Sequence, residues 1–431
     1  MIERHRTTNI LAGLSLGLLL AGAAPADERQ TSGVVAGMSL ERLERLDEHF
    51  HRYVDDGLIS GVVTYIVRHG EVVHEDAYGL ADIAANRPMS QDTYFYVYSM
   101  TKPVTSVALL ILYEEGKFQL DDPLGKYLPE MADLKLYAGD DANGNMILKD
   151  PARQPTIQDV FRHTAGFLYG PAGNRGIDRA YAEAGLLEGT LAELTRKLGK
   201  LPLAYEPGTQ WIYSVSHDVQ ARLVEVLSGM PFDEFVRQRI LEPLGMKNTV
   251  FGRPEALKDR FAVIYGRNQG GQLQPTGALD QPGAATRVLG GFSLSSTAAD
   301  YARFAQMLVN SGELDGVRIL SPAMLALARR NHTGDMPNQL YKRVAENAGW
   351  QVPPANQGIG FQVRGTGVFH HLFGTLASPE THGNYGAGST MFWVDPERDV
   401  SFALCSAGVM TQAANIERCQ KLSDLALSAM V

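Results

Sequence analysis

Apolar residues near the start of the chain follow two different spacings. Over residues 40–54 they stand three or four positions apart with charged residues between them, which predicts an amphipathic helix. Two apolar runs follow at residues 62–67 and 72–79, on either side of Arg68-His69-Gly70-Glu71. Short runs rich in β-branched residues around a polar turn that contains glycine predict a β-hairpin.

Helical spacing dominates the middle of the chain, where apolar residues recur every three or four positions. Residues 331–356 show no regular pattern, and we expect them to be irregular. Strand-like runs return late in the chain, and a helical pattern closes it: strands at 358–364, 388–394 and 399–406, and a helix over 413–430.

Strands therefore lie towards both ends of the chain, with helices between them. This order predicts an α/β fold of the α+β kind, in which an antiparallel sheet built from both termini is flanked by helices and carries an inserted, mainly helical domain. We expect the sheet domain to comprise residues 27–98 and 260–431, and the helical domain to comprise residues 99–259.

The first 26 residues have the layout of a secretory signal peptide. Arg4, His5 and Arg6 form a positive region, and the apolar run 10–24 is too short to span a membrane comfortably. Ala24-Pro25-Ala26 offers a cleavage site, with residues 21–23 as a second choice. We expect export to a periplasm or to the medium and no stable membrane anchor; the alternative is an uncleaved N-terminal anchor.

Composition and charge exclude several classes of partner. The chain has 431 residues, 45% of them hydrophobic, and a formal net charge of −9 without a long basic run. Nucleic-acid binding through phosphate neutralisation is therefore not expected. Cys405 and Cys419 are the two cysteines; they could pair in an exported protein, but their spacing is not that of a metal site.

The polar stretch Asp140–Asn145 has some likeness to a calcium-binding loop. The first ligand position of such a loop would fall on Gly139, which has no side chain to coordinate a cation. We therefore predict a hairpin turn here and no metal.

Ser99 and Lys102 form the candidate catalytic motif. An extended aromatic run precedes Ser99 and a helical pattern follows it, so a lysine three residues on lies one turn away on the same helix face. An adjacent amine can take the proton of a serine hydroxyl, and a helix N-terminus favours a nearby oxyanion. The alternative is that Ser99 caps the helix and Lys102 is solvated.

Four further stretches accompany this motif in the order His163-Thr164-Ala165-Gly166, the run from Pro207 through Tyr213 to Ser216, the turn and helix 289–308, and Gly383–Pro396. Together with the Ser99 segment they resemble the serine β-lactamase-like superfamily, and within it the class C-like esterases known as family VIII carboxylesterases. The resemblance runs from about residue 40 to about residue 428.

The resemblance implies a role for each matching residue. Ser99 matches the acylated nucleophile, and Lys102 matches the amine that shares its proton. Tyr213 matches a tyrosine that acts as general base, either as a phenolate or within a proton relay; an unperturbed tyrosine titrates near ~10. The strand Asn384-Tyr385-Gly386 matches the substrate-binding K-T-G strand, and the backbone N–H groups of Ser99 and Ala387 would form the oxyanion hole.

The chain departs from the lactamase pattern at three of these positions. Val215 replaces the asparagine that follows the tyrosine in the motif, and Asn384 and Tyr385 replace the lysine and threonine of the strand. A neutral asparagine cannot supply the cationic anchor that lysine provides. His382 could instead begin a variant of the strand motif, an alternative we rank second because the spacing to Phe392-Trp393 favours Asn384.

Four further histidines are not assigned catalytic roles. We expect His163 to be structural, we place His370 and His371 in a loop, and we leave the direction of His217 open.

The sequence thus predicts a serine hydrolase that cleaves short-chain carboxylic esters through a Ser99 acyl-enzyme, without metal or organic cofactor. The alternatives are a β-lactamase or D-Ala-D-Ala carboxypeptidase-type enzyme, and a catalytically silent relative that binds peptidoglycan or a partner. The expected partner is a small-molecule ester; the oligomeric state is left open.

Overall fold

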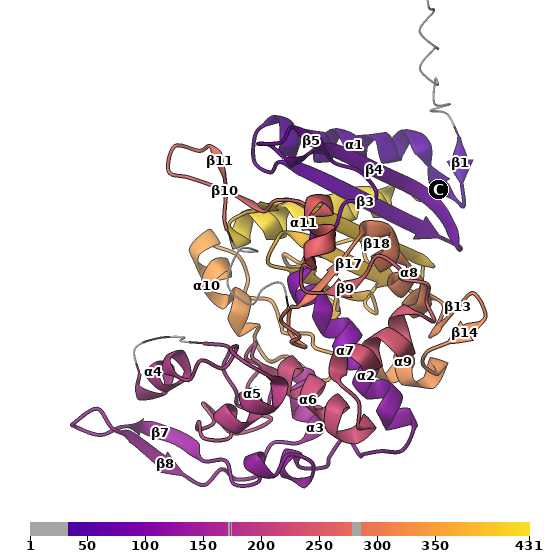
Figure 1. Ribbon diagram of the computed structural model, residues 1–431. Helices are drawn as coiled ribbons and strands as arrows, with labels where there is room; N and C mark the ends of the chain where they lie inside the picture. The colour runs from indigo at the N-terminus through magenta and orange to yellow at the C-terminus, as the bar shows by residue number, and fades with distance from the viewer. Residues whose placement is uncertain (1–32, 171–172, 174, 278–285) are drawn as a thin grey trace, which may run out of the picture.

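A seven-stranded antiparallel sheet is the central element of the fold (Figure 1). The computed structural model describes residues 33–170, 173, 175–277 and 286–431, so the predicted signal peptide lies outside the described residues. The strands run in the order β15 (Gln362–Val363), β16 (His382–Gly386), β17 (Thr390–Asp395), β18 (Val400–Ser406), β3 (Gly61–Arg68), β4 (Glu71–Asp82) and β5 (Arg87–Pro88). The sheet is therefore built from both ends of the chain, as the sequence predicted.

Helices cover both faces of this sheet, and the alternation of side chains along β17 shows how the layers are held. Trp393 points to the face covered by α1 (Leu40–Asp55) and α11 (Gln412–Ser428), where its Nε1 donates to Ser423 Oγ at 2.9 Å. Its neighbour Phe392 packs on the opposite face, 4.8 Å ring to ring from Tyr301 of α8 (Ala298–Val309). Successive residues of a strand point to opposite faces, so one strand contributes side chains to two separate hydrophobic cores.

The helical part of the molecule packs against the second of these faces. Its central element is α2 (Thr101–Glu114), whose residues are buried from Thr101 to Leu112, as expected for a helix that is surrounded by protein. Helix α6 (Ser216–Ser228) and helix α7 (Phe232–Val236), with its π-helical continuation (Arg237–Leu241), pack against α2, and α3 (Ile157–Arg162) and α5 (Leu191–Leu198) pack against α6. Helix α4 (Gly176–Glu183) and the projecting hairpin of β7 (Leu136–Asp140) and β8 (Met146–Lys149) lie further out (Figure 1).

Smaller elements connect these layers. A three-stranded sheet joins β6 (Phe95–Tyr96), β12 (Leu294–Ser296) and β9 (Val250–Phe251). The others are β1 (Val34–Val35), β2 (Met38–Ser39), β10 (Tyr265–Arg267), β11 (Leu273–Pro275), β13 (Glu313–Leu314), β14 (Val317–Arg318), α9 (Pro322–Ala328) and β19 (Gly408–Val409). Among the described helices, none has both the length and the apolar composition needed to cross a membrane.

The predicted N-terminal helix, hairpin and nucleophile helix are confirmed, whereas three predictions in the C-terminal half need correction. Residues 331–356 contain helix α10 (Gln339–Ala348), which is capped by Asn338 and whose Tyr341 packs into the core beneath α11. The strand predicted over 358–364 is reduced to β15, because Gly358 and Phe361 close a turn by a 2.8 Å hydrogen bond. The strand predicted over 388–394 begins only at Thr390, since a turn separates it from β16.

The structure also tests the predictions for the stretch Asp140–Asn145 and for the two cysteines. Asp141 closes the β7–β8 turn by accepting hydrogen bonds from the N–H groups of Asn143 and Asn145 at 2.8 and 2.9 Å, which confirms the predicted hairpin. The cysteines do not pair: both are buried free thiols, and they belong to different cores, with Cys405 facing α2 and α8 and Cys419 lying on α11.

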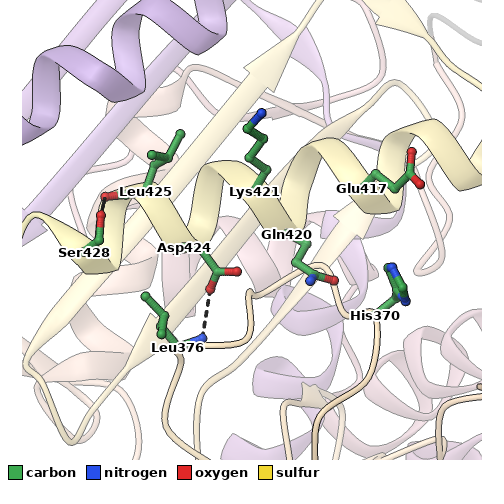
Figure 2. Close-up of a pocket in the computed structure, with 8 residues that line it drawn as sticks. All are labelled: His370, Leu376, Glu417, Gln420, Lys421, Asp424, Leu425 and Ser428. Carbon is green, nitrogen blue, oxygen red and sulfur yellow. Dashed lines mark hydrogen bonds between the residues drawn. The ribbon is translucent and has the colours of Figure 1, made fainter.

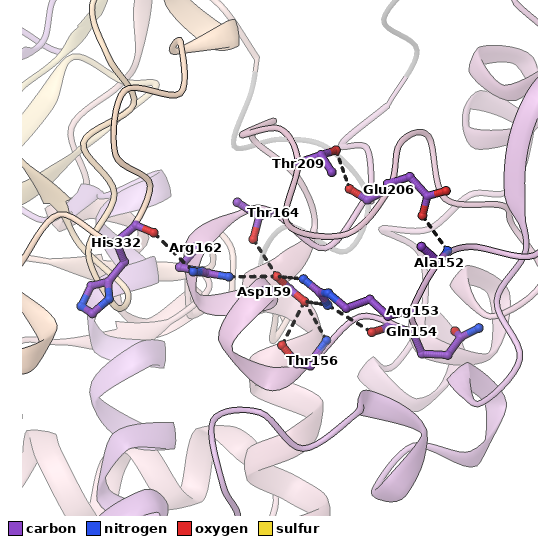
Figure 3. A network of polar contacts seen from close by, with 10 residues as sticks. All are labelled: Ala152, Arg153, Gln154, Thr156, Asp159, Arg162, Thr164, Glu206, Thr209 and His332. Atoms are coloured by element: carbon purple, nitrogen blue, oxygen red, sulfur yellow. Dashed lines mark hydrogen bonds and ion pairs between the residues drawn. The ribbon is translucent and has the colours of Figure 1, made fainter.

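The carboxylate of Asp159 organises the end of α3 (Figure 3). It is fully buried and accepts hydrogen bonds from Arg153 at 2.6 and 3.1 Å, from Arg162 at 3.1 Å, and from the hydroxyl of Thr164 at 2.9 Å. It also accepts from the N–H of Thr156 at 2.9 Å, which completes a capping box. This network fixes the reversal after α3, where His163 adopts a left-handed conformation with φ of 58°.

We predict that Asp159→Asn lowers the free energy of unfolding by about 3 kcal/mol, the low end for breaking a buried ion pair, because Arg153 can rehydrate. Burial alone would raise the pKa of Asp159, but its hydrogen bonds, chiefly from Arg153, hold that pKa below the ordinary 3.8. The stabilisation is therefore present above pH 3.8 and is lost as the pH falls through the lowered pKa. Urea unfolding of both proteins between pH 3 and pH 7 should show the difference narrowing at the acidic end.

Glu41→Gln supplies the control for this experiment. Glu41 forms an exposed pair with Arg45, and pairs of that kind contribute about 0–1 kcal/mol. An Asp159→Asn protein as stable as the Glu41→Gln protein at pH 7 would contradict the role assigned to the network.

Candidate active site

Ser99 lies in a single 3₁₀ turn (Tyr98–Met100) between β6 and α2. The residue before it, Tyr98, has φ of +45°, a conformation that non-glycine residues adopt only where their surroundings enforce it. Three hydrogen bonds enforce it here: Thr101 Oγ1 to Tyr98 O at 2.6 Å, Tyr301 Oη to Met100 O at 2.6 Å, and the N–H of Val97 to Leu294 O at 3.0 Å. The serine is therefore held on a rigid corner.

Lys102 and Tyr213 both reach the hydroxyl of Ser99. Lys102 is fully buried, and its Nζ donates to Ser99 Oγ at 3.1 Å and to the carbonyl of Gly291 at 2.7 Å. Tyr213, 114 residues further along the chain, donates its phenolic proton to Ser99 Oγ at 2.8 Å. The structure thus brings the three residues that the sequence selected within hydrogen-bond reach of one oxygen.

Burial sets the protonation of the two groups beside Ser99. Burial lowers the pKa of Lys102 to about 7, with the negative charge of Asp218 acting against this shift. Burial raises the pKa of Tyr213 well above 10, so this residue is a neutral phenol at neutral pH. The phenolate alternative is therefore disfavoured, and the amine of Lys102 is the base that can be free near neutrality.

Asp218 is a further residue of the site, which the sequence analysis did not select. It is fully buried on α6, and its Oδ1 accepts from the N–H of Gly291 at 2.9 Å. The carbonyl of that same residue accepts a hydrogen bond from the Lys102 amine, so Asp218 holds the residue that holds the lysine. Burial raises the pKa of Asp218 to about 6, with Lys102 opposing the rise.

The sequence did carry one signal of this contact, the pair Gly290-Gly291. A Cβ atom on Gly290 would lie 2.2 Å from the carbonyl oxygen of His217, and one on Gly291 would lie 3.0 Å from Asp218 Oδ2. Glycine is needed because the two backbones approach so closely.

Aromatic rings enclose Tyr213 and the lysine. The ring of His163 lies 4.8 Å from that of Tyr213 and 4.8 Å from that of His217, while Tyr169 stacks on Tyr213 at 5.7 Å. Lys102 Nζ lies 4.6 Å above the Tyr213 ring. Burial lowers the pKa of His163 and His217 well below 6.5, so both are neutral and serve as packing for the tyrosine.

The end of β16 packs directly against the serine corner. A Cβ atom on Gly386 would lie 2.4 Å from the carbonyl oxygen of Val97, and one on Gly388 would lie 3.0 Å from the ring of Tyr98. Ala387 stands between these two glycines, in the turn that packs against the serine corner. In the described part of the chain, β15 pairs only with His382 and Gly383, so the stretch Asn384–Gly386 forms an open edge of the sheet.

The side chains of this strand differ in accessibility. Asn384 is 4% exposed, and its Oδ1 accepts from the N–H of Tyr385 at 2.9 Å, so its amide is turned onto its own backbone. Tyr385 is half-buried, with its ring 6.0 Å from that of Tyr341, and its charge would raise the pKa of Tyr213 further. His382 is buried edge-on against Phe361 at 5.2 Å, and burial lowers its pKa to about 4.

The other predicted residues lie outside this cluster or beneath it. Val215 is fully buried in the core at the start of α6. His370 stacks on Trp350 with ring centroids 4.0 Å apart, and the same residue lines a surface pocket over the outer face of α11 (Figure 2). That pocket contains none of the residues around Ser99.

Comparison with known proteins shows the family of this chain. A family model described as Beta-lactamase matches residues 46–418. Esterase EstB of Burkholderia gladioli is 30% identical over 81% of this chain and 84% of its own length. A putative D-alanyl-D-alanine carboxypeptidase of Escherichia coli K12 is 27% identical, covering 93% of this chain and 90% of its own.

A solved structure agrees at the level of the fold. EstCE1, described as a hydrolase with promiscuous acyltransferase activity, superposes with a TM-score of 0.69 at 23% identity, covering 89% of this chain and 98% of its own. These comparisons confirm the resemblance and the fold class that the sequence predicted.

The lowered pKa of Lys102 generates a prediction about the reactivity of Ser99. The neutral amine accepts the serine proton, so the rate at which a fluorophosphonate labels Ser99 should rise with pH through about 7 and then level off. Lys102→Met should lower the plateau by about 10²–10⁴-fold, the usual contribution of a general base. Mass spectrometry of the labelled serine at each pH gives the rates. A wild-type rate that stays flat between pH 5 and pH 9 would contradict the assignment of Lys102 as the base.

Removing the charge of Asp218 should move this profile. Asp218→Asn keeps an oxygen for the Gly291 N–H but loses the negative charge that raises the pKa of Lys102. The midpoint of the labelling profile should therefore shift to lower pH, and the plateau should be retained. Asp233→Asn, on α7, is the matched control and should leave the midpoint in place. An unchanged midpoint in Asp218→Asn would show that the charge does not act on the lysine.

Proposed function

The chain belongs to the Beta-lactamase family of serine hydrolases, and we propose that it cleaves short-chain carboxylic esters through an acyl-enzyme on Ser99. The observation that carries this proposal is the shared hydrogen bonding of Lys102 and Tyr213 to one serine oxygen, at 3.1 and 2.8 Å. A nucleophile paired with a base and a second proton donor is the arrangement required for acyl transfer.

In the acylation half, Ser99 Oγ attacks the ester carbonyl and its proton passes to the neutral amine of Lys102. The N–H groups of Ser99 and Ala387 stabilise the tetrahedral oxyanion. When the intermediate collapses, the C–O bond to the alcohol breaks. Tyr213 gives its proton to the departing alkoxide and recovers one from the Lys102 ammonium, which leaves the acyl group on Ser99.

In the deacylation half, water takes the place of the alcohol. It gives a proton to the neutral amine of Lys102 as it attacks the acyl carbon, and the Lys102 ammonium returns that proton to Ser99 Oγ as the acid leaves. Asp218 holds the Gly291 peptide and thereby keeps Lys102 aimed at Ser99 throughout this cycle.

The chemistry of the β16 edge favours an uncharged substrate. Asn384 and Tyr385 stand where the related lactamase strand has a lysine and a threonine, and the Asn384 amide is engaged with the backbone N–H of Tyr385. Val215 is buried in place of an asparagine that would face a lactam amide. The identity with Esterase EstB supports the same choice.

A penicillin-recognising peptidase is the second candidate, supported by the 27% identity with the putative D-alanyl-D-alanine carboxypeptidase of E. coli over most of both chains. We also propose that the protein acts in a periplasm or in the medium, on the basis of the signal-peptide pattern in residues 1–26.

Hydrolysis of p-nitrophenyl acetate, butyrate and octanoate, measured beside nitrocefin, tests the proposal. We expect kcat/KM for the acetate and butyrate esters to exceed that for nitrocefin by about 10²-fold or more, and Ser99→Ala to lower ester turnover by roughly 10⁴-fold or more.

Ser106→Ala is the matched control, because Ser106 is also a buried serine of α2 but donates to Gln220 at 2.8 Å, away from the site. It should retain activity. Faster turnover of nitrocefin than of the esters would replace the esterase proposal with the second candidate.

A further inference from the structure

A buried arginine lies behind the turn that carries Ala387. Arg418, on α11, is fully buried, and its Nη2 donates to the carbonyl of Ser389 at 2.8 Å. The same guanidinium donates to Ser406 Oγ at 3.2 and 3.1 Å and to Asn415 Oδ1 at 3.2 Å. Each of these acceptors is uncharged, and the ring of Tyr53 lies 5.8 Å from the guanidinium carbon.

Such an arrangement is unfavourable for stability alone. A buried cation whose contacts are all neutral loses its hydration without a full ionic partner, and an apolar side chain of the same size is often at least as stable in such a place. Stability alone therefore does not explain Arg418, and its role lies in the segment that it holds in place.

Arg418 holds the turn between β16 and β17. Ser389, at the end of that turn, has φ of +63°, and its N–H donates to Gly386 O at 3.0 Å. Its carbonyl oxygen accepts hydrogen bonds from Arg418 and from the hydroxyl of Ser406, the latter at 2.6 Å. The turn Ala387–Ser389 is thus closed by one hydrogen bond and anchored at its far end by two donors that lie outside it.

We propose that Arg418 is a positioning residue that aims the N–H of Ala387 at the oxyanion. The proposal rests on the proposed acyl-transfer function. Gly386 and Gly388 press the turn against the serine corner, and Arg418 fixes it from the opposite side, so the Ala387 N–H has little freedom to rotate. An oxyanion donor acts on the tetrahedral state and contributes little to the ground state. Loss of Arg418 therefore lowers kcat and leaves KM nearly unchanged.

The chain offers two matched controls. Arg364 is likewise a buried arginine that donates to neutral carbonyls, those of Gly374 at 2.7 Å and Gly367 at 3.0 Å, but it holds the loop after β15. Lys421 lies on α11 itself, on the outer face that lines the surface pocket in Figure 2. Arg364→Met controls for the loss of a buried guanidinium, and Lys421→Met controls for a change on the same helix.

The experiment compares Arg418→Met, Arg418→Lys and the two controls in the full chain. Ester turnover gives kcat and KM per active site, with sites counted by fluorophosphonate labelling. A second readout is the affinity of phenylboronic acid, whose boron bonds to Ser99 Oγ while the serine proton passes to Lys102. One oxygen of the resulting tetrahedral adduct then occupies the oxyanion site.

For Arg418→Met we expect kcat to fall by about 10²-fold, the scale for loss of one oxyanion donor, with KM changed by less than about threefold. The boronate dissociation constant should rise in parallel, the labelling profile near pH 7 should keep its midpoint, and Arg418→Lys should recover part of the loss. Arg418→Met values that match those of Arg364→Met in kcat and boronate affinity would overturn the proposal.

A misfolded Arg418→Met protein and a failure of the proposed function give different results. If Arg418→Met does not fold, Ser406→Ala removes one of the two donors to Ser389 and should show the same effect at smaller size; unchanged boronate affinity there would overturn the proposal. If the wild-type protein cleaves no ester, the proposed function fails, while boronate affinity still tests Arg418 because it needs Ser99 but no turnover.

Discussion

Burial of the Lys102 amine next to Ser99 is the constraint on which the site depends. A lysine inside a protein loses hydration, which lowers its pKa and makes the free amine available near neutral pH. That burial is tolerable only because the Nζ atom has two oxygen partners and the faces of two tyrosine rings around it. The surrounding protein must therefore enclose α2, which is buried from Thr101 to Leu112.

The fold can be understood as the means of bringing distant segments to this amine. The sheet built from both termini places the end of β16 against the turn that precedes α2, and close glycine contacts fix the distance. The helical region delivers Tyr213 from one side and Asp218 from the start of α6. Gly291 then connects the two regions, because its carbonyl accepts from Lys102 and its N–H donates to Asp218. A shift of any one of these elements would change the hydrogen bonds of the serine.

The local part of this arrangement was predictable from sequence, whereas the long-range part was not. Ser99 and Lys102 share a helix face by spacing alone, and the apolar stripe of α1 and the hairpin after it are equally local. Asp218 and Arg418 act through backbone groups of Gly291 and Ser389, and a backbone carbonyl has no signature in a sequence. Helix α10 was not predicted because few of its residues are buried, so its apolar stripe is short. That the two cysteines do not pair follows from their positions in different hydrophobic cores, which only the assembled sheet defines.

The charge balance of the site gives a physical reason for the proposed preference for uncharged esters. Burial moves the pKa of Lys102 down to about 7 and that of Asp218 up to about 6, so the two groups come close to exchanging a proton. When Lys102 is the free amine and Asp218 is ionised, the pair carries a charge of −1, and Asn384 adds none. A neutral ester can enter such a site without an electrostatic penalty, whereas the carboxylate of a penicillin or of a D-alanyl peptide would lose hydration beside that negative charge. Preference for an uncharged substrate would then follow from the charge that the site carries when Lys102 is free.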